Sequence, residues 1–267
     1  MTLAAVALAA GRGERLRPLT DVHPKVLLPV DGVPLLDLAL GRLATCVDAD
    51  AASTAVNAHY LAGQVVDHTG SRAHVNVEPD VALGTAGALG ALREWLDGRD
   101  VLLTNGDVYQ PGDLSPLVEG WDGDRCRLLV ADAGERRVDF RTPGGHGVRY
   151  LGSCLLPWRL VSGLVAEPSG LYERLWRDLD ATGALDLVPW PGVSIDCGTP
   201  ADYLAANLEA SGGRSVVARS AVVEGTVERC VVWDGAYVGP QERLRDCVRA
   251  GTRDHPVTVA GAAAGRG

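Results

Sequence analysis

Leu3-Ala4-Ala5-Val6-Ala7-Leu8-Ala9-Ala10-Gly11-Arg12-Gly13 is the stretch from which the rest of the fold can be worked out. Residues 3–8 form an apolar run of a length typical of a buried strand. Glycines at 11 and 13 follow, and glycine lets backbone N–H groups approach a phosphate without a side chain in the way. The stretch therefore predicts a strand that ends in a phosphate-binding loop.

Positive charge is concentrated directly after this strand. Arg12, Arg15, Arg17 and Lys25 place four cations within fourteen residues of a chain whose formal net charge is −9. An acidic protein that binds an anion needs such a local concentration. Lys25 is also the only lysine in a chain that has 24 arginines. Its compact ammonium suits a phosphate that changes geometry during a reaction. Chance retention of one surface lysine is the simpler alternative.

Apolar strands alternate with helical patterns through the first 105 residues. Strands are expected at 3–8, 53–57, 73–77 and 101–104, and helices at 34–47, 60–68 and 86–96. This order implies right-handed crossovers and a largely parallel sheet, that is, an α/β, Rossmann-like domain. Ligands of such sheets bind beyond the carboxyl ends of the strands, where the glycine-containing loops of this chain lie.

The second half is less regular. Strands are expected at 127–131 and 148–155, joined by a hairpin turn at Gly144-Gly145-His146-Gly147. A helix is expected at 171–179 and a strand at 193–196. Thr199 is expected to cap a helix that begins at Pro200, has Asp202 in its capping box and ends near residue 210.

The pattern changes after Ser211-Gly212-Gly213, which is interpreted as a hinge. Val216 and Val222 lie six residues apart, and Val232, Val238 and Leu244 repeat that step. A six-residue apolar period favours the coils of a short β-helix over an ordinary β-rich tail. The expected organisation is a catalytic domain at 1–213, a β-helix-like tail at 214–250 and a flexible end at 251–267.

Two aspartates follow apolar strands. Asn105-Gly106-Asp107 ends one strand, and Ile195-Asp196 ends another. Mg²⁺ takes one or two carboxylates together with phosphate oxygens, so such a pair is sufficient to hold it. For Asn105-Gly106 the alternative is an ordinary turn.

A third candidate site is the small-residue stretch Leu83-Gly84-Thr85-Ala86-Gly87-Ala88-Leu89, preceded by Glu78-Pro79. Small residues at a helix start leave room for a flat group, such as a nucleotide base, against the backbone. Close packing of the helix is an equally good explanation of this stretch alone.

Composition excludes several classes of protein. A net charge of −9 argues against nucleic acid as a partner. No apolar run is long enough to cross a bilayer, and the run at 3–10 lacks the preceding basic residue of a secretion signal. The six cysteines show neither close pairing nor metal-ligand spacing, which favours a reducing cytoplasm.

Together these motifs resemble the sugar-1-phosphate nucleotidyltransferases, the family that includes mannose-1-phosphate guanylyltransferases and N-acetylmuramate-1-phosphate uridylyltransferases. The resemblance covers nearly the whole catalytic region, in family order: 8–25, Asn57-Ala58-His59-Tyr60, 83–89, 105–107 and 196–203. The tail stretch 231–239 resembles the short left-handed β-helix of the guanylyltransferase members. The substrates implied are a nucleoside triphosphate and a sugar 1-phosphate, with Mg²⁺ as cofactor, and assembly into a homo-oligomer stays open.

The resemblance assigns roles to residues of this chain. It implies catalytic roles for Arg15, Lys25 and Asp107, and Mg²⁺ binding by Asp107 and Asp196. The residues implied to bind the nucleotide are Leu8, Ala9, Ala10, Gly11, Gly13, Asn57, Glu78, Gly84, Thr85 and Gly87. Those implied to bind the second substrate are Tyr150, Gly152, Arg141 and Asp196.

One departure concerns the acceptor. The family often carries a Phe-x-Glu-Lys-Pro stretch whose lysine grips the sugar phosphate, whereas this chain has Phe140-Arg141-Thr142-Pro143 and no second lysine. Arg141 or Arg149 is the candidate substitute. A modified sugar, a cyclitol phosphate or another phosphorylated alcohol therefore stays open as acceptor.

The reaction implied is an in-line displacement at the α-phosphorus of a nucleoside triphosphate, with GTP favoured over UTP. The rivals are a nicotinamide oxidoreductase, a non-catalytic nucleotide-sugar sensor and a cytidylyltransferase that acts on choline phosphate. The oxidoreductase needs a complete G-x-G-x-x-G fingerprint, but Leu16 stands where its third glycine belongs.

Overall fold

The computed structural model describes residues 2–78 and 80–261. These residues form two compact units: unit 1 comprises 2–12 and 36–194, and unit 2 comprises 13–35 and 195–261. Each unit is described by itself. Pro79 of the Glu78-Pro79 motif and residues 262–267 lie outside the described part of the chain.

Unit 1 is built on a mixed sheet. Its strands are β1 (Leu3–Leu8), β4 (Thr54–Ala58), β5 (His74–Val77), β6 (Asp100–Asn105), β8 (Cys126–Asp132), β9 (Phe140–Arg141), β10 (Gly147–Leu156) and β11 (Leu185–Pro189). Their order is β11-β8-β10-β6-β1-β4-β5, with β9 beside β10. β1 is parallel to β4 and β6, and β4 to β5, as the sequence predicts. β10 runs antiparallel to β6 and β8.

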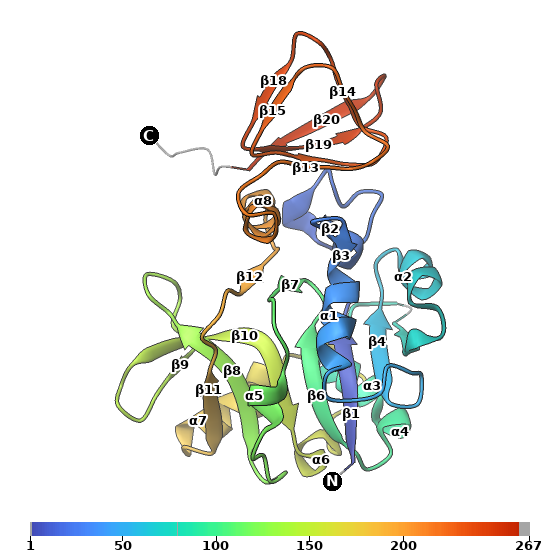
Figure 1. Cartoon of the computed structure of the whole chain (residues 1–267). Coiled ribbons are helices and arrows are strands. Elements are labelled where there is room, and N and C mark those ends of the chain that lie inside the picture. The colour runs from blue at the N-terminus through green and yellow to red at the C-terminus, as the bar shows by residue number, and fades with distance from the viewer. Residues whose placement is uncertain (1, 79, 262–267) are drawn as a thin grey trace. The chain divides into compact units, whose positions relative to one another are not determined.

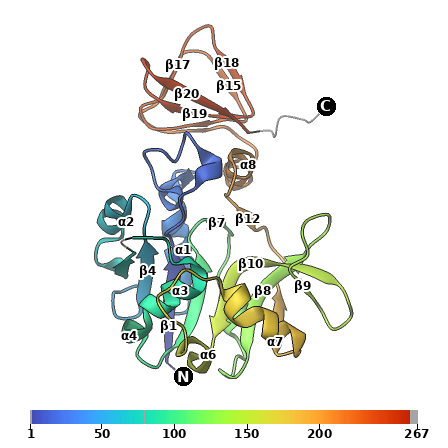
Figure 2. The same cartoon turned by 180° about the vertical axis from the view of Figure 1, so that it is seen from behind.

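Helices cover both faces of this sheet. They are α1 (Leu35–Leu43), α2 (Ala62–Thr69), α3 (Gly84–Ala91), α4 (Arg93–Leu96), α5 (Ser115–Val118), α6 (Trp158–Val161) and α7 (Arg177–Ala181), with a π-helical turn at Tyr172–Trp176. Figure 1 shows α1 and α5 on one face, and Figure 2 shows α3 and α7 on the other. No helix among the described residues has the length and apolar character needed to span a bilayer.

The core of unit 1 explains why its strands are apolar throughout. Val6 and Leu103 pack with Leu89 and Trp176 on the face covered by α3 and α7. The alternate residues, such as Ala5 and Leu102, are fully buried on the other face. Strands covered on both sides need apolar side chains at every position, so their sequences do not alternate between apolar and polar residues.

Several boundaries differ from those expected. The single helix expected at 86–96 is α3 and α4, because the helix is interrupted at Leu92. The turn at residues 142–146 connects the unpredicted strand β9 to β10 rather than joining β8 to β10. The unpredicted strand β11 extends the sheet by pairing in parallel with β8. β9 has only two residues, which is too few for a clear hydrophobic period. β11 contains Asp186 and ends at Pro189, and both residue types are depleted in strands.

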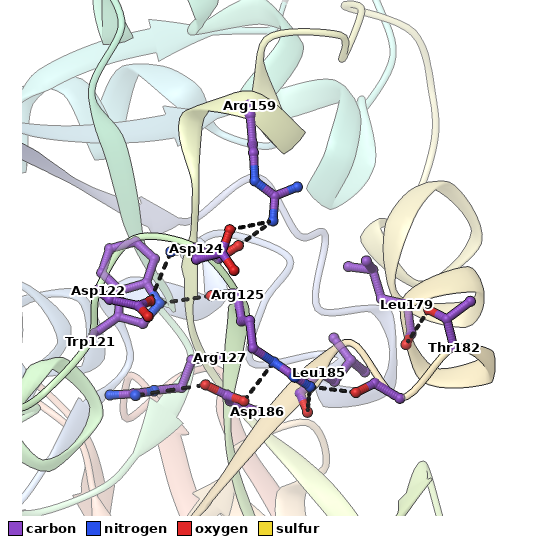
Figure 3. A network of polar contacts seen from close by, with 11 residues as sticks. Trp121, Asp122, Asp124, Arg125, Arg127, Arg159, Leu179, Thr182, Leu185 and Asp186 are labelled. Atoms are coloured by element: carbon purple, nitrogen blue, oxygen red, sulfur yellow. Dashed lines mark hydrogen bonds and ion pairs between the residues drawn. The ribbon is translucent and has the colours of Figure 1, made fainter.

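Charged side chains fix the outer strand β11. Arg125 Nε lies 2.9 Å from Asp186 Oδ1, and Arg127 Nη2 lies 3.7 Å from the other oxygen of that carboxylate. Arg125 also donates to the carbonyls of Gly183 and Leu185. Figure 3 shows these arginines on either side of Asp186. The contacts join β8 to β11 and to the turn that precedes it.

Unit 2 combines two segments that are distant in sequence. The first carries 3₁₀ turns at Glu14–Leu16 and Lys25–Leu27 and a hairpin of β2 (Pro29–Val30) with β3 (Val33–Pro34). The second begins with β12 (Ile195–Asp196) and α8 (Pro200–Ala210). Thr199 caps α8 as predicted, since its Oγ1 accepts from the Asp202 N–H at 3.2 Å. The Tyr203 hydroxyl donates to the Pro29 carbonyl at 2.6 Å, which ties the segments together.

The tail of unit 2 consists of short strands. They are β13 (Val216–Val217), β14 (Val222–Val223), β15 (Thr226–Glu228), β16 (Val231–Val232), β17 (Tyr237–Val238), β18 (Arg243–Arg245), β19 (Cys247–Gly251) and β20 (Pro256–Ala260). Parallel pairs join β13 to β16, β16 to β19, β14 to β17 and β15 to β18. β20 runs antiparallel to β19, so a strand occupies part of the end that the sequence predicts to be flexible.

The pairing register gives the repeat of this tail. Val216 pairs with Val231, and Val231 with Val248, so strands that pair in parallel lie 15 to 17 residues apart in the sequence. The six-residue step seen in the sequence leads from one short strand to the next along the chain. Val222, assigned to the apolar repeat, is 51% exposed, whereas its neighbour Val223 packs against Val232, Ala236 and Val238.

A prediction concerns the contact between α1 and α2. Asp37 Oδ1 accepts from His68 Nε2 at 2.8 Å and Arg72 Nη1 at 2.7 Å. Burial acts to raise the pKa of Asp37, but the hydrogen bonds from Arg72 and His68 outweigh it and hold the pKa below its ordinary value. We expect Asp37→Asn to lower the free energy of unfolding by about 1 kcal/mol at neutral pH, measured by urea denaturation.

The pH dependence checks the cause of that loss. A carboxylate with a lowered folded-state pKa stabilises the fold above its unfolded pKa of about 3.9, and the contribution disappears as the pH falls through the folded value. The difference between wild type and Asp37→Asn should therefore shrink below about pH 4. Asp67→Asn, at an exposed carboxylate of α2, is the control and should change little. Equal losses in the two variants would contradict the assignment.

Candidate active site

The carboxyl ends of three parallel strands meet in one row. Leu8 at the end of β1 pairs with Asn57 of β4 on one side and with Asn105 of β6 on the other. A cavity of about 240 Å³ lies at this row. It is lined by Leu8, Ala10, Gly11, Asn57, Ala82, Gly84, Thr85, Asn105 and Asp107. Most of the residues implied to bind the nucleotide therefore share one cavity in unit 1 with Asp107.

A buried hydrogen-bond network supports the wall of this cavity. The Ala9 N–H donates to Asn57 Oδ1 at 2.7 Å, and Asn57 Nδ2 donates to Glu78 Oε1 at 2.7 Å. Glu78 Oε2 accepts from the Leu83 N–H at 2.8 Å, directly before α3. Ala9 and Glu78 do not line the cavity. They connect the loop after β1, the end of β4 and the start of α3, so the structure places them as supports.

The glycines of α3 lie against another segment of unit 1. Gly84 has φ of +70°, and a Cβ there would meet the Ser169 carbonyl oxygen at 2.6 Å. A Cβ on Gly87 would collide with the carbonyl of Glu167. Gly84 also lines the cavity, but Gly87 does not. Close packing of the helix, the alternative considered for this stretch, accounts for the position of Gly87.

A second cavity adjoins the first. It has about 300 Å³ and is lined by Thr85, Leu103, Asn105, Tyr150, Gly170, Leu171, Tyr172, Glu173 and Trp176. Thr85 and Asn105 line both cavities. The rings of Tyr150 and Trp176 meet edge to face with centroids 4.8 Å apart. Burial raises the pKa of the Tyr150 hydroxyl well above its ordinary value, so it stays protonated.

Gly152 leaves room for Asn105, one of the two residues that line both cavities. Its φ is +84°, and the register of β10 against β8 shifts between Tyr150 and Cys154. A Cβ at this position would meet Asn105 Nδ2 at 3.0 Å and Asn105 Cγ at 3.1 Å. Gly152 does not line either cavity, but the space that it leaves is occupied by the Asn105 side chain.

A buried arginine beside Asp107 was not expected from the sequence. Arg42 on α1 donates to the backbone carbonyls of Val108 and Gln110 and to the Thr104 hydroxyl. In the sequence it looks like an ordinary solvated residue near the end of an amphipathic helix. The only feature of the sequence that could have indicated its burial is its place among the apolar positions of that helix.

Unit 2 gathers the other charged residues of the predicted site. Lys25 is buried, and its Nζ lies 3.3 Å from Asp196 Oδ1. Arg15 lies beside the same turn, because a Cβ on Gly198 would meet Arg15 Nη2 at 2.6 Å and Asp196 Oδ1 at 3.4 Å. Gly13, with φ of +63°, lies against the Cβ of Lys25. Arg15, Lys25 and Asp196 therefore form one charged group within this unit.

The residues present fit a magnesium ion by their chemistry. Asp107 brings a hard carboxylate oxygen to a cavity whose other polar lining groups are amides, a hydroxyl and backbone. Among the described residues no three His, Cys, Asp or Glu side chains cluster as a metal cage. Mg²⁺ sites at phosphates need only one or two carboxylates, because the substrate supplies further oxygens.

Neither candidate for the missing lysine lines these cavities. Arg141 lies on β9, where Nη1 donates to the Gly145 carbonyl at 3.0 Å, and it lines a separate cavity with Arg125 and Arg127. Arg149 Nη2 donates to the Ser194 carbonyl at 3.3 Å.

A larger cavity of about 770 Å³ lies in unit 2. The residues that line it come from the segments 23–34, 211–219 and 231–234, and none of these lining residues is a predicted site residue.

Comparisons with known proteins identify what this arrangement is similar to. Residues 5–254 match the family model described as the MobA-like NTP transferase domain. A Caulobacter vibrioides protein named N-acetylmuramate alpha-1-phosphate uridylyltransferase is 32% identical over 232 residues, covering 76% of this chain and 94% of that protein.

Two further proteins extend the comparison. A Sulfolobus acidocaldarius protein with the provisional name mannose-1-phosphate guanyltransferase is 29% identical over 235 residues, covering 78% of this chain, which spans only 63% of that protein. A solved structure described as mannose-1-phosphate geranyltransferase from Thermus thermophilus has a TM-score of 0.72 at 20% identity, covering 98% of this chain and 96% of that one. At this identity the likeness shows the fold.

A prediction follows from the position of Gly152. Gly152→Ala and Gly145→Ala both place a Cβ on a residue with φ above +80°, which costs about 1–2 kcal/mol of unfolding free energy. Only at Gly152 does the new Cβ press on Asn105, whereas nothing lies within 4 Å at Gly145. We expect Gly152→Ala to lose about 1–3 kcal/mol more than Gly145→Ala in urea denaturation. Equal losses of unfolding free energy in the two variants would show that the Asn105 side chain moves aside at no cost in stability.

Proposed function

We propose that this chain, which belongs to the family of MobA-like NTP transferase domains, is a nucleotidyltransferase. It would transfer a nucleoside monophosphate from a nucleoside triphosphate to a sugar 1-phosphate and release pyrophosphate. The observation that carries the proposal is the cavity at the carboxyl ends of β1, β4 and β6, lined by six of the residues implied to bind the nucleotide and by Asp107. Such strand ends are where ligands of α/β sheets bind.

The cavity suits a nucleotide in chemistry as well as in place. Gly11 and Gly84 leave the backbone accessible, and the side chains of Asn57, Thr85 and Asn105 offer donors and acceptors. The neighbouring cavity, with Tyr150, Glu173 and Trp176, is the proposed place for the acceptor. Because Thr85 and Asn105 line both, substrates in the two cavities would lie side by side.

The chemistry needs little covalent help from the protein. An oxygen of the acceptor phosphate forms a bond to the α-phosphorus while the bond to the bridging oxygen of pyrophosphate breaks. That acceptor oxygen is already ionised, so no general base is required. Positioning and neutralisation of charge dominate in such transfers.

Charged residues take the remaining roles. Asp107 would hold Mg²⁺, with Asp196 as the second ligand implied by the resemblance, and the ion would neutralise charge on the reacting phosphates. Lys25 and Arg15 would offset the charge that develops on the attacked and leaving groups. The Lys25–Asp196 pair would orient the ammonium, because it limits the positions that a flexible lysine can adopt.

GTP and a mannose 1-phosphate-like acceptor are the substrates that we propose first. The stretch 83–87 resembles that of guanylyltransferases, and the parallel strand pairs of the tail support the proposal that it is a short β-helix like theirs. The absence of a second lysine points to an acceptor phosphate held by other groups than in most relatives.

Uridylyl transfer to an amino-sugar phosphate is the second candidate. The similarity to the Caulobacter vibrioides protein favours it, because the chain aligns with 94% of the length of a protein named for that reaction. The two candidates differ in base and acceptor but share the same chemistry.

The first test of the proposal is magnesium-dependent release of pyrophosphate, with each nucleoside triphosphate crossed against a panel of sugar 1-phosphates. We expect one pair to release pyrophosphate, and Asp107→Ala or Lys25→Ala to lower kcat by at least about 100-fold. Asp67→Asn, at an exposed carboxylate far along α2, is a control that should leave the rate unchanged. A folded protein that binds no triphosphate would contradict the proposal; binding without release would favour a sensor.

Lys25 allows a second, independent test. It is the single lysine, so this side chain and the α-amino group are the only amines that an acylating reagent can modify at alkaline pH. We expect a bound triphosphate with Mg²⁺ to slow the labelling of Lys25 by about 10-fold or more, because the ammonium contacts its phosphates. Peptide mass spectrometry gives the rate, with the α-amino group as internal control. Equal labelling with and without a bound triphosphate would exclude that contact.

A further inference from the structure

Arg42 is the feature of unit 1 that the proposed reaction does not yet use. It lies on α1 and is only 5% exposed. Its Nη1 donates to the Val108 carbonyl at 3.0 Å and to the Gln110 carbonyl at 3.3 Å. Its Nη2 donates to the Thr104 hydroxyl at 3.1 Å. The guanidinium therefore contacts residues on both sides of Asp107.

Burial of this charge needs a reason. Arginine is almost never fully buried unless it is paired, because removal of a guanidinium from water is costly. The hydrogen-bond acceptors of Arg42 are neutral, and the charge that acts on it is that of Asp107. Burial lowers the pKa of Arg42 to about 10, which still leaves it charged at neutral pH.

The forked shape of the guanidinium allows Arg42 to reach all of these acceptors. Two carbonyls after Asp107 and one hydroxyl before it lie in different directions, and arginine carries five donors on a rigid plane. The Thr104 hydroxyl also lies 2.8 Å from Ser153 Oγ on β10, so the contact reaches the strand that carries Gly152. A lysine ammonium is a single point of charge and cannot cover these acceptors equally well.

We propose that Arg42 is a positioning residue: it holds the segment 104–110 and, through it, the carboxylate of Asp107 in the cavity. The holding role stands on the geometry of unit 1 alone. The consequence for turnover rests on the proposed function. Supports of this kind typically change metal affinity or activity by 10- to 100-fold when they are removed.

The experiment compares Arg42→Met and Arg42→Lys with wild type and with a control. The control is Arg99→Met, because Arg99 also donates to backbone carbonyls, of Leu96 at 2.9 Å and Ala52 at 2.6 Å, and directly precedes the strand whose other end leads to Asp107. The first readout is amide hydrogen exchange of residues 104–110 without metal or substrate. The Gly106 N–H donates to the Leu8 carbonyl at 2.8 Å and is the most direct reporter.

We expect exchange of residues 104–110 to rise by at least about 10-fold in Arg42→Met and by less in Arg42→Lys, and to stay near wild type in Arg99→Met. In the pyrophosphate assay we expect kcat of Arg42→Met to fall by 10- to 100-fold and the Mg²⁺ concentration for half-maximal rate to rise. Arg42→Lys should recover part of both.

Three outcomes would overturn the inference. Wild-type exchange of 104–110 in folded Arg42→Met would show that Arg42 does not hold the segment, and wild-type exchange in Arg42→Lys would show that the fork of the guanidinium is not required to hold it. Equal changes in Arg42→Met and Arg99→Met would indicate a general loss of stability. A fall in kcat without faster exchange would indicate a different role. If wild type releases no pyrophosphate, the proposed function fails, and the exchange experiment still decides the holding role.

Discussion

The parallel register of β1 with its two neighbours is the constraint on which the candidate site depends. Leu8 pairs with Asn57 and with Asn105, so three strands end in one row, and these three residues line the same cavity as the loops that follow β1 and β6. A shift of one residue would turn every side chain of β1 to the opposite face of the sheet. Both faces are packed, so the buried helices fix the register and thereby fix which backbone groups line the cavity.

Those parts of the fold whose chemistry is local could be predicted from the sequence. The strand 3–8 was located to the residue, since an apolar run bounded by glycine has few other interpretations. Thr199 was identified as a cap because its hydroxyl acts on a backbone N–H nearby. Glu78 and Gly87 were predicted to bind the nucleotide together with residues that line the cavity, but the sequence could not separate residues that line a cavity from residues that support its wall.

The features that the sequence missed depend on distant partners. β11 pairs in parallel with β8, and its Asp186 contacts Arg125 and Arg127, neither of which lies near it in sequence. The burial of Arg42 depends on hydrogen bonds to carbonyls more than sixty residues away in the sequence. This acidic chain thus has buried positive charge in both units: the guanidinium of Arg42 acts on Asp107 in unit 1, and Lys25 pairs with Asp196 in unit 2.

The division of the chain has a consequence for its synthesis on the ribosome. Residues 13–35 belong to unit 2, whose remaining residues begin at 195. The carbonyl of Pro29 and the N–H of Asp31 meet Tyr203 and Asn207, partners translated more than 170 residues later. Domains generally fold as they emerge, with the N-terminal one first. Here the segment 13–35 lacks these partners until about three quarters of the chain has been made, so unit 1 is the part whose contacts are complete first.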